Sequence, residues 1–190
     1  ELSFPEVYVD DENYLRGRID RIDKKDQFVR VIDYKTGDKE FKIVNLLNGL
    51  DLQLLVYMMA LSQNNKEVMV PIGSFYMPLK DDLESLKDGY SKEAIEASIL
   101  DKFRINGLIV KINDEIFKLI DKNADDLKAS SVIDIKKSDI LQPEEMKRLE
   151  DFAKKLVSKY ISNIKQGHIK LNPLSYKSDK NECQYCAYKG

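Results

Sequence analysis

The sequence lacks several features that would assign it to a class directly. Its 190 residues include two cysteines and one histidine, too few to complete a four-ligand metal site from those residue types alone. It has no apolar run near the roughly 18 to 20 residues that a membrane helix needs. Its first residues also lack the basic and apolar segments of a signal peptide. These absences argue against a membrane protein and lead us to expect a cytoplasmic location.

An excess of positive charge is missing as well. The formal net charge is −2 and the pI is near 5.6, so the whole chain lacks the electrostatic footprint of proteins that bind nucleic acid through charge alone. Lysines outnumber acids only toward the carboxyl end, after about residue 147. We interpret most of these lysines as one solvated helix face, and a few as candidates for phosphate contact.

The composition favours one globular domain over residues 1–190. With 43% hydrophobic and 34% charged residues, a chain of this length can bury a core of its own. It shows no internal repeat or low-complexity tract. Because it does not begin with methionine and stops abruptly at Gly190, we expect it to be a segment of a longer polypeptide.

Two extended runs near the amino end predict a β-hairpin. Residues 14–22 and 28–36 have strand-like patterns, and a polar turn over 23–27 joins them. Residues 43–63 carry apolar side chains at helical spacing, which predicts a helix packed against the hairpin. Strand-like residues 67–79 complete a strand–strand–helix–strand order, which implies a mixed sheet with helices on its faces. The predicted fold class is therefore α/β or α+β.

The second half of the chain has weaker patterns. We expect a loop over 80–90 and a short helix over 92–104, whereas 107–122 and 131–136 are ambiguous. A long amphipathic helix is predicted over 143–166, because proline suits its first turn, glutamates favour its positive end and a glycine follows it. Its apolar residues form one stripe: Met146, Leu149, Phe152, Ala153, Leu156, Tyr160 and Ile164.

The hairpin carries the residues best suited to chemistry. On a strand over 28–36, Asp33 and Lys35 share one face because alternate residues point the same way. Asp20 on the partner strand can come opposite or diagonal to Asp33, where two like charges are unfavourable unless a cation lies between them. A divalent metal would remove that cost. Oxygen ligands suit Mg²⁺ or Mn²⁺, and the backbone carbonyl of Tyr34 is close enough in sequence to be a further ligand.

Such a group is suited to hydrolysing a phosphodiester. The metal would neutralise charge in the transition state and lower the pKa of a bound water, while Lys35 would hold or help activate the nucleophile. The same residues also occur on the surface of ordinary charged hairpins. For the Asp-x-Lys triplet alone, that structural interpretation is the more frequent one.

A wider set of motifs distinguishes the two interpretations. Within residues 13–61 the chain contains, in order, Gly17-x-x-Asp20, Asp33-Tyr34-Lys35-Thr36 and Gln53-x-x-x-Tyr57. This order resembles the RecB-type nucleases of the PD-(D/E)XK superfamily, whose core is a restriction-endonuclease-like mixed sheet flanked by helices. The resemblance implies that Asp20 and Asp33 bind metal and that Lys35 is catalytic. It also implies that Gln53 and Tyr57, which lie on one face of a helix, support the site or contact DNA.

The two cysteines, Cys183 and Cys186, form a C-x-x-C pair near the end of the chain. From the residues alone, a redox pair, half of a zinc site, part of an iron–sulfur site and two unligated thiols all remain open. A branch of the resembled family, the helicase–nuclease subunits of the AddB type, has such a pair, a third cysteine soon after it and a fourth upstream. That resemblance implies a [4Fe-4S] cluster of which residues 183–190 supply one part, with the third cysteine just beyond Gly190.

The resemblance to that branch also implies a function. It predicts a magnesium-dependent deoxyribonuclease domain with exonuclease activity, cleaving single strands that an AddA-like helicase–nuclease partner unwinds during double-strand break processing for recombinational repair. In one respect the chain departs from the family, because residues 1–14 contain no match to the upstream helix that brings a histidine or glutamate to the metal. Two other interpretations stay open: a stand-alone RecB-like exonuclease of the CRISPR-associated kind, and a catalytically inactive DNA-binding scaffold domain.

Overall fold

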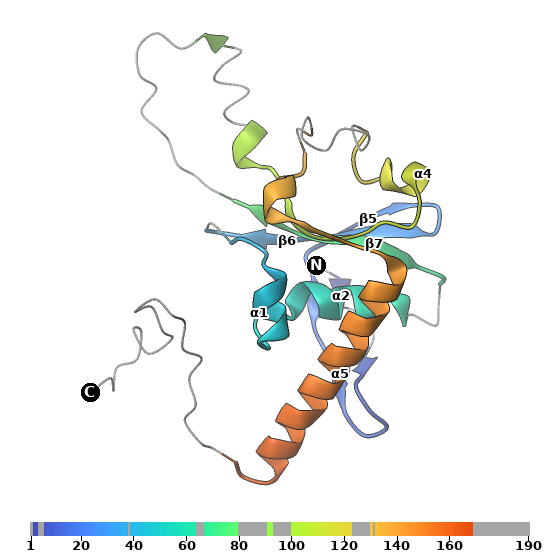
Figure 1. The fold of residues 1–190 in the computed structure, drawn as a ribbon, viewed down its shortest axis with the longest axis vertical. Coiled ribbons are helices and arrows are strands. Elements are labelled where there is room, and N and C mark those ends of the chain that lie inside the picture. Colours follow the sequence, from blue (N-terminus) through green and yellow to red (C-terminus); the bar gives the residue numbers. More distant parts are fainter. Residues whose placement is uncertain are drawn as a thin grey trace, which may run out of the picture.

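A mixed five-stranded sheet forms the centre of the structure (Figure 1). The computed structural model describes residues 2–3, 6–37, 39–63, 67–79, 91–92, 100–122, 130 and 132–168. The strands of the sheet, in spatial order, are β5 (Arg21–Lys25), β6 (Phe28–Lys35), β7 (Val70–Pro78), β8 (Asn106–Val110) and β9 (Asp139–Leu141). The pairs β6–β7 and β8–β9 are parallel, whereas β5–β6 and β7–β8 are antiparallel.

Helices cover both faces of this sheet. On one face lie α1 (Ile43–Leu47), α2 (Gln53–Ser62) and α5 (Pro143–Lys165), and on the other lie α4 (Asp114–Phe117) and the short 3₁₀-helix η2 (Ile135–Lys137) (Figure 1). Because β6 and β7 run parallel, the chain must return along the sheet between them. Helices α1 and α2 lie in that crossover. The α/β class with a mixed sheet flanked by helices is thus confirmed.

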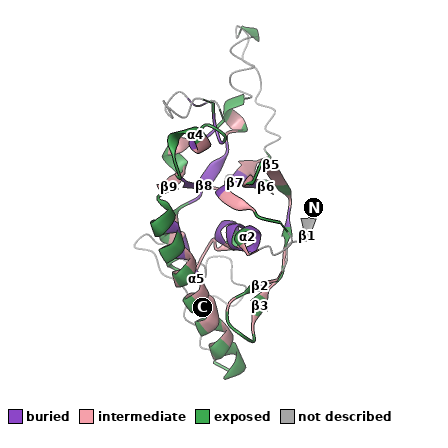
Figure 2. Cartoon of the chain, turned by 90° about the vertical axis from the view of Figure 1, so that its right-hand side faces the viewer, coloured by how far each residue is buried: buried purple, intermediate pink, exposed green. Residues whose placement is uncertain are grey.

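Apolar cores lie on both sides of the sheet. Neighbouring residues of β7 enter opposite cores, since successive side chains of a strand point to opposite faces. Tyr76 packs with Leu54 and Met58 of α2, whereas Phe75 packs with Phe117 of α4. Helix α2 is buried over nearly its whole surface (Figure 2). The packing of α2 against the sheet therefore fixes the position of this helix.

The predicted hairpin is confirmed, but its first strand is interrupted. The pairing sets Arg21 opposite Ile32, and the chain turns at residues 26 and 27 rather than over 23–27. A bend at Asp20 separates β5 from the preceding residues. Those residues pair outside the central sheet, in the short antiparallel pairs β1 (Leu2–Ser3) with β4 (Arg18–Ile19) and β2 (Val7–Tyr8) with β3 (Tyr14–Leu15).

The single helix predicted over 43–63 is wrong, because the structure contains α1 and α2 with a break between them. Gly49 has φ +80° and Asp51 has φ +53°, left-handed conformations that end a helix. A Cβ on Gly49 would also meet the side chain of Leu156 at 3.2 Å, so the glycine lets α5 approach closely. The apolar spacing continues across this break, which is why the pattern could not reveal it.

The long helix predicted over 143–166 is confirmed by α5. Glu145 in its first turn accepts a hydrogen bond from the backbone N–H of Gln142 at 2.8 Å, which satisfies a donor that the helix itself leaves unpaired. The apolar stripe is only partly buried. Met146 packs in the core, whereas Ile164 is 75% exposed, on the last turns that extend beyond the sheet (Figure 2).

The second half of the chain contains short elements where its sequence pattern was ambiguous. The ambiguous segments 107–122 and 131–136 form β8, α4 and η2. The loop predicted over 80–90 and most of the helix predicted over 92–104 lie outside the described residues. Across the described parts of the chain, every helix is too short or too polar to cross a membrane.

Strands β7 and β8 approach each other closely at Gly107. A Cβ there would lie 2.8 Å from the Cα of Phe75 and closer still to the carbonyl oxygen of Ser74, and these backbone atoms cannot move without opening the sheet. We predict that Gly107→Ala lowers the free energy of unfolding by about 1 to 3 kcal/mol, measured by urea denaturation. Gly37→Ala is the control, since nothing lies within 4 Å of a Cβ at that position. An equal loss in both variants would contradict the packing argument.

Candidate active site

Asp33 and Lys35 lie together at the carboxyl end of β6. Asp33 is only 2% exposed, and its strand pairs there with Tyr76 of β7. The ammonium of Lys35 lies 2.5 Å from Asp33 Oδ2, as the alternation of side chains along a strand predicts. The two residues form a partly buried ion pair at the edge where the parallel strands β6 and β7 end.

Helix α2 adds two polar side chains to this pair. The Nε2 of Gln53 donates to Asp33 Oδ1 at 2.9 Å and to the hydroxyl of Tyr57 at 2.6 Å. The Oε1 of Gln53 accepts a hydrogen bond from Lys35 at 2.9 Å, and the Tyr57 hydroxyl lies 3.3 Å from Asp33 Oδ1, to which it can donate. The four side chains therefore form a closed network, with the Gln53 amide bridging the carboxylate and the ammonium.

The hydroxyl of Tyr57 remains protonated in this setting. Burial is the main effect that raises its pKa, and the negative charges of Asp33 and Asp20 raise the pKa further, against an opposing hydrogen bond from Gln53. A neutral phenol can donate a hydrogen bond to a carboxylate, whereas a phenolate cannot. Tyr57 therefore acts as a donor that supports the charge of Asp33.

Asp20 lies beside the same strand end. Its Oδ2 accepts a hydrogen bond from the backbone N–H of Tyr34 at 2.9 Å, and its charge acts on the Tyr57 hydroxyl. The residue sits in the bend directly before β5, whose pairing with β6 ends at Arg21 and Ile32. The bend directs its carboxylate to the backbone at Tyr34.

The donor set fits a hard divalent cation with few protein ligands. Asp33 Oδ2 is buried and accepts no hydrogen bond from the described residues, so its contact with Lys35 is one of charge. Across these residues, no three side chains of aspartate, glutamate, histidine or cysteine gather around one point. Mg²⁺ is commonly held by one or two carboxylates, with waters and substrate phosphates completing its shell. Two carboxylates near the end of β6 meet that requirement.

Sequence reasoning missed a tyrosine that contacts Lys35. Tyr76 is 1% exposed and pairs with Asp33 across the parallel strands. Its ring lies 5.3 Å from the ammonium of Lys35 and 5.9 Å from that of Lys39. Burial, and then the charge of Asp51, raise the pKa of its hydroxyl. No local pattern links residue 76 with residues 33 to 39, so only the strand pairing could have identified it.

The positions of the two cysteines are not described by the structure. Cys183 and Cys186 fall beyond the described residues, so their predicted role in an iron–sulfur site has no structural observation for or against it. The predicted role of the Tyr34 carbonyl as a metal ligand also stays a prediction.

Comparison with known proteins shows the same family over the whole chain. Residues 1–190 match the sequence profile of the PD-(D/E)XK nuclease superfamily. The chain is 35% identical, over 94% of its length, to a protein of Caldanaerobacter subterraneus that is named as a subunit of an ATP-dependent helicase/deoxyribonuclease. Proteins of the same name from Clostridium novyi and Carboxydothermus hydrogenoformans are each 31% identical, over 92% and 98% of this chain.

These relatives are much longer than the chain, which spans 16% of the length of the first two and 18% of the third. The match nevertheless covers the complete sheet and the network around Asp33, and the fold is the mixed α/β arrangement described above. The chain belongs to the PD-(D/E)XK nuclease superfamily.

Proposed function

We propose that this chain is the nuclease domain of an AddB-like helicase–deoxyribonuclease subunit, and that it hydrolyses DNA phosphodiester bonds with Mg²⁺ or Mn²⁺. The observation that carries the proposal is the closed network of Asp33, Lys35, Gln53 and Tyr57. It holds a buried carboxylate and an ammonium side by side at an accessible edge of the sheet. Family membership supports the same chemistry.

In this proposal Asp20 and Asp33 hold the metal ion, and the backbone carbonyl of Tyr34 is a further oxygen ligand. When bound, the metal would supply positive charge to the scissile phosphate and lower the pKa of a water molecule. Asp33 Oδ2 is paired by charge with Lys35 but accepts no hydrogen bond from the described residues, so it retains lone pairs for a cation. Burial of this carboxylate restricts its motion, so little reorganisation is needed when the ion binds.

Lys35 orients the reacting groups. An ammonium has three hydrogen-bond donors, and those that face Asp33 and Gln53 fix its position. A third donor can contact a phosphate oxygen or the attacking water. The Tyr76 ring supports the ammonium from β7, so Lys35 is held from three directions.

Gln53 and Tyr57 act as positioning residues. Both direct donors to Asp33 Oδ1, so Oδ2 is engaged only by the charge of Lys35 and would be shared with the ion. Because the Gln53 amide also accepts from Lys35, one side chain sets the distance between the metal ligand and the lysine.

The names of the relatives support the proposed biological setting. A subunit of an ATP-dependent helicase/deoxyribonuclease would receive single strands from duplex ends that an AddA-like helicase partner unwinds. We propose that the domain acts on these strands as an exonuclease in the cytoplasm, during double-strand break processing for recombinational repair.

We further propose that Cys183 and Cys186 are two ligands of a [4Fe-4S] cluster in the complete protein. The C-x-x-C spacing and the likeness to a helicase/deoxyribonuclease protein over 94% of this chain support it. The cluster would be structural, joining the end of this domain to a cysteine far upstream.

At the active site, one prediction concerns the carboxylate of Asp33 and the ammonium of Lys35. Asp33→Asn and Lys35→Ala in the full-length protein, assayed with a partner whose own nuclease centre is inactivated, should each reduce DNA cleavage more than about a thousandfold, since each removes a charge from the reacting centre. Cleavage of a labelled single strand in Mg²⁺ measures this, and EDTA should abolish the wild-type activity. Asp26→Asn is the control, because Asp26 lies exposed in the turn of the same hairpin. Wild-type turnover in both active-site variants would refute the assignment.

A second prediction separates positioning from a role in α2 stability. Gln53→Ala should lower both the turnover number and the affinity for Mn²⁺ by about 10- to 100-fold, as loss of a group that orients a metal ligand usually does. Calorimetric titration with Mn²⁺ measures the affinity without any cleavage. Gln63→Ala, at the other end of α2, should leave both values unchanged. Unchanged Mn²⁺ affinity in Gln53→Ala would show that the amide does not position Asp33.

The cluster has its own test. The purified full-length protein should contain about four iron atoms and absorb near 400 nm, as [4Fe-4S] centres held by cysteine do. Cys183→Ser should remove most of the iron and the absorbance. Zinc in place of iron, or iron that survives the substitution, would exclude this assignment.

A further inference from the structure

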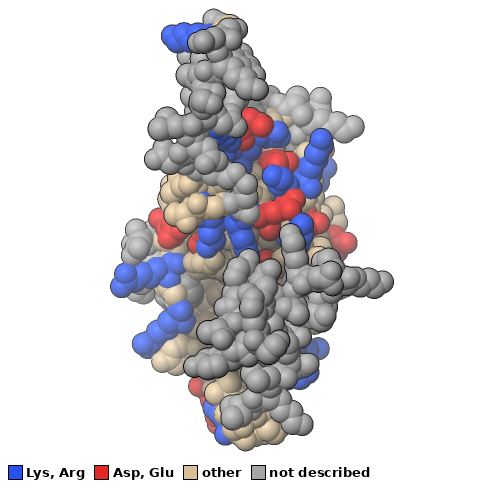
Figure 3. Space-filling model, turned by 90° about the vertical axis from the view of Figure 1, so that its left-hand side faces the viewer, with Lys and Arg blue, Asp and Glu red and all other residues tan. Residues whose placement is uncertain are grey.

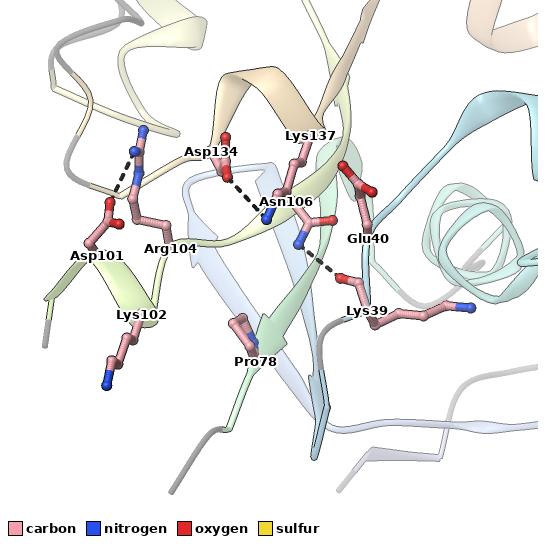
Figure 4. Close-up of a pocket in the computed structure, with 9 residues that line it drawn as sticks. All are labelled: Lys39, Glu40, Pro78, Asp101, Lys102, Arg104, Asn106, Asp134 and Lys137. Carbon is pink, nitrogen blue, oxygen red and sulfur yellow. Dashed lines mark hydrogen bonds and ion pairs between the residues drawn. The ribbon is translucent and has the colours of Figure 1, made fainter. Parts of the chain in front are cut away.

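A pocket of about 400 Å³ opens at the same edge of the sheet as the active site. Its walls come from the segment after β6, the end of β7, the start of β8 and the residues around η2, and they include Glu40, Pro78, Asn106 and Lys137 (Figure 4). Pro78 pairs with Lys35 across the parallel strands. The pocket therefore lies beside Lys35, at the same edge of the sheet.

One wall of the pocket is held rigidly by Asn106. This side chain is 4% exposed, accepts a hydrogen bond from the backbone N–H of Phe41 at 2.7 Å and donates to the carbonyl of Lys39 at 3.1 Å. Both ends of the amide are thus used to fasten the segment that leaves β6. A wall fixed in this way keeps its shape when a ligand enters.

Lys39 connects the pocket with the active site. Its backbone lines the pocket, while its side chain extends away from Asn106 (Figure 4) to form an ion pair with Asp51 and to reach the ring of Tyr76. The same ring contacts the ammonium of Lys35. Lys35, Lys39 and the pocket therefore follow one another along this edge, so a bound polyanion that contacts Lys35 can extend past Lys39 into the pocket.

The charged side chains of the pocket are suited to exchange partners. Arg104 pairs with Asp101 at 3.2 Å, and Lys137 lies 3.7 Å from Asp134. Basic and acidic side chains gather side by side on this face of the molecule (Figure 3). Each pair has one exposed and one mostly covered partner, and Arg104 also donates to the carbonyl of Ile133. Partly exposed pairs contribute little, so a phosphate can replace the carboxylates at small cost and gain from counterion release.

We propose that this pocket holds the sugar–phosphate backbone of the DNA strand next to the bond that is cut, with Lys102, Lys137 and Arg104 contacting its phosphates. The proposal rests on the nuclease function proposed above. No aromatic side chain is among the described residues that line the pocket, so these residues bind through charge and not through base stacking. Their contacts with the strand should be independent of base sequence and should weaken as salt is added.

The test uses the full-length protein with its partner and a charge reversal at two pocket lysines. Lys102→Glu together with Lys137→Glu should raise KM for cleavage of an oligothymidylate strand about tenfold and leave kcat unchanged. The dependence of log KM on log salt should become shallower by about 1.4, since each contact with a single strand contributes roughly 0.7. Hydrolysis of the p-nitrophenyl ester of thymidine monophosphate, which is too short to reach the pocket, should proceed at the wild-type rate.

The control carries the same change of charge elsewhere. Lys25 ends β5 at the opposite edge of the sheet and Lys122 follows α4, and both are exposed. Lys25→Glu with Lys122→Glu should leave KM at the wild-type value. A KM within twofold of wild type in the pocket variant, or an equal rise in the control, would overturn the proposal.

A second measurement does not depend on cleavage. A phosphorothioate strand carrying azidophenacyl groups on its backbone, bound in EDTA, should crosslink to peptides that contain residues 100–104 or 132–137, and the pocket variant should lose these crosslinks. If the wild-type protein cleaves no DNA, the proposed function fails, yet the crosslinks still decide the pocket. Crosslinks confined to other segments would refute it.

Discussion

A carboxylate buried at the end of a sheet strand is the constraint on which this structure depends. Asp33 is 2% exposed near the carboxyl end of β6, where it pairs with Tyr76 of β7. An ionised carboxylate taken from water costs several kcal/mol unless it is paired and hydrogen-bonded. The compensating groups among the described residues come along the strand, from Lys35, and from the helix that covers it, α2. The residues of the candidate site are therefore also those that compensate the burial of its carboxylate.

The crossover between β6 and β7 is arranged to deliver those groups. Left-handed residues at Gly49 and Asp51 end α1 and let α2 begin at Gln53, next to the end of β6. The break is itself stabilised, since the carboxylate of Asp51 pairs with Lys39 and accepts from Asn45 at 2.9 Å. The helix break and the active site share the Tyr76 ring, which contacts both lysines. A change in the crossover would thus alter the contacts of the residues around Asp33.

Charge is distributed in a way that the total conceals. A net charge of −2 gives no general attraction for DNA. Any affinity for DNA would have to come from basic side chains clustered at one place on the surface. The carboxyl edge of β6 and β7 has such cations, in ion pairs that are weak because they are partly exposed. Acidic partners keep these lysines and arginines from repelling one another in the free protein.

By itself the sequence determined the local elements and the identity of the central residues. Alternation along β6 placed Asp33 beside Lys35, a spacing of four placed Gln53 above Tyr57, and end signals marked α5, because each depends on neighbours within one turn or strand. The break in the crossover helix has a local signal in Gly49, which the continuing apolar spacing concealed. Only the tertiary structure decided that Asp20 reaches the backbone of Tyr34, and that Tyr76 and Asn106 complete the edge. Those contacts join segments that are far apart in the chain. Whether such segments meet depends on the order of the strands and on how closely their backbones approach, and a local sequence pattern predicts neither.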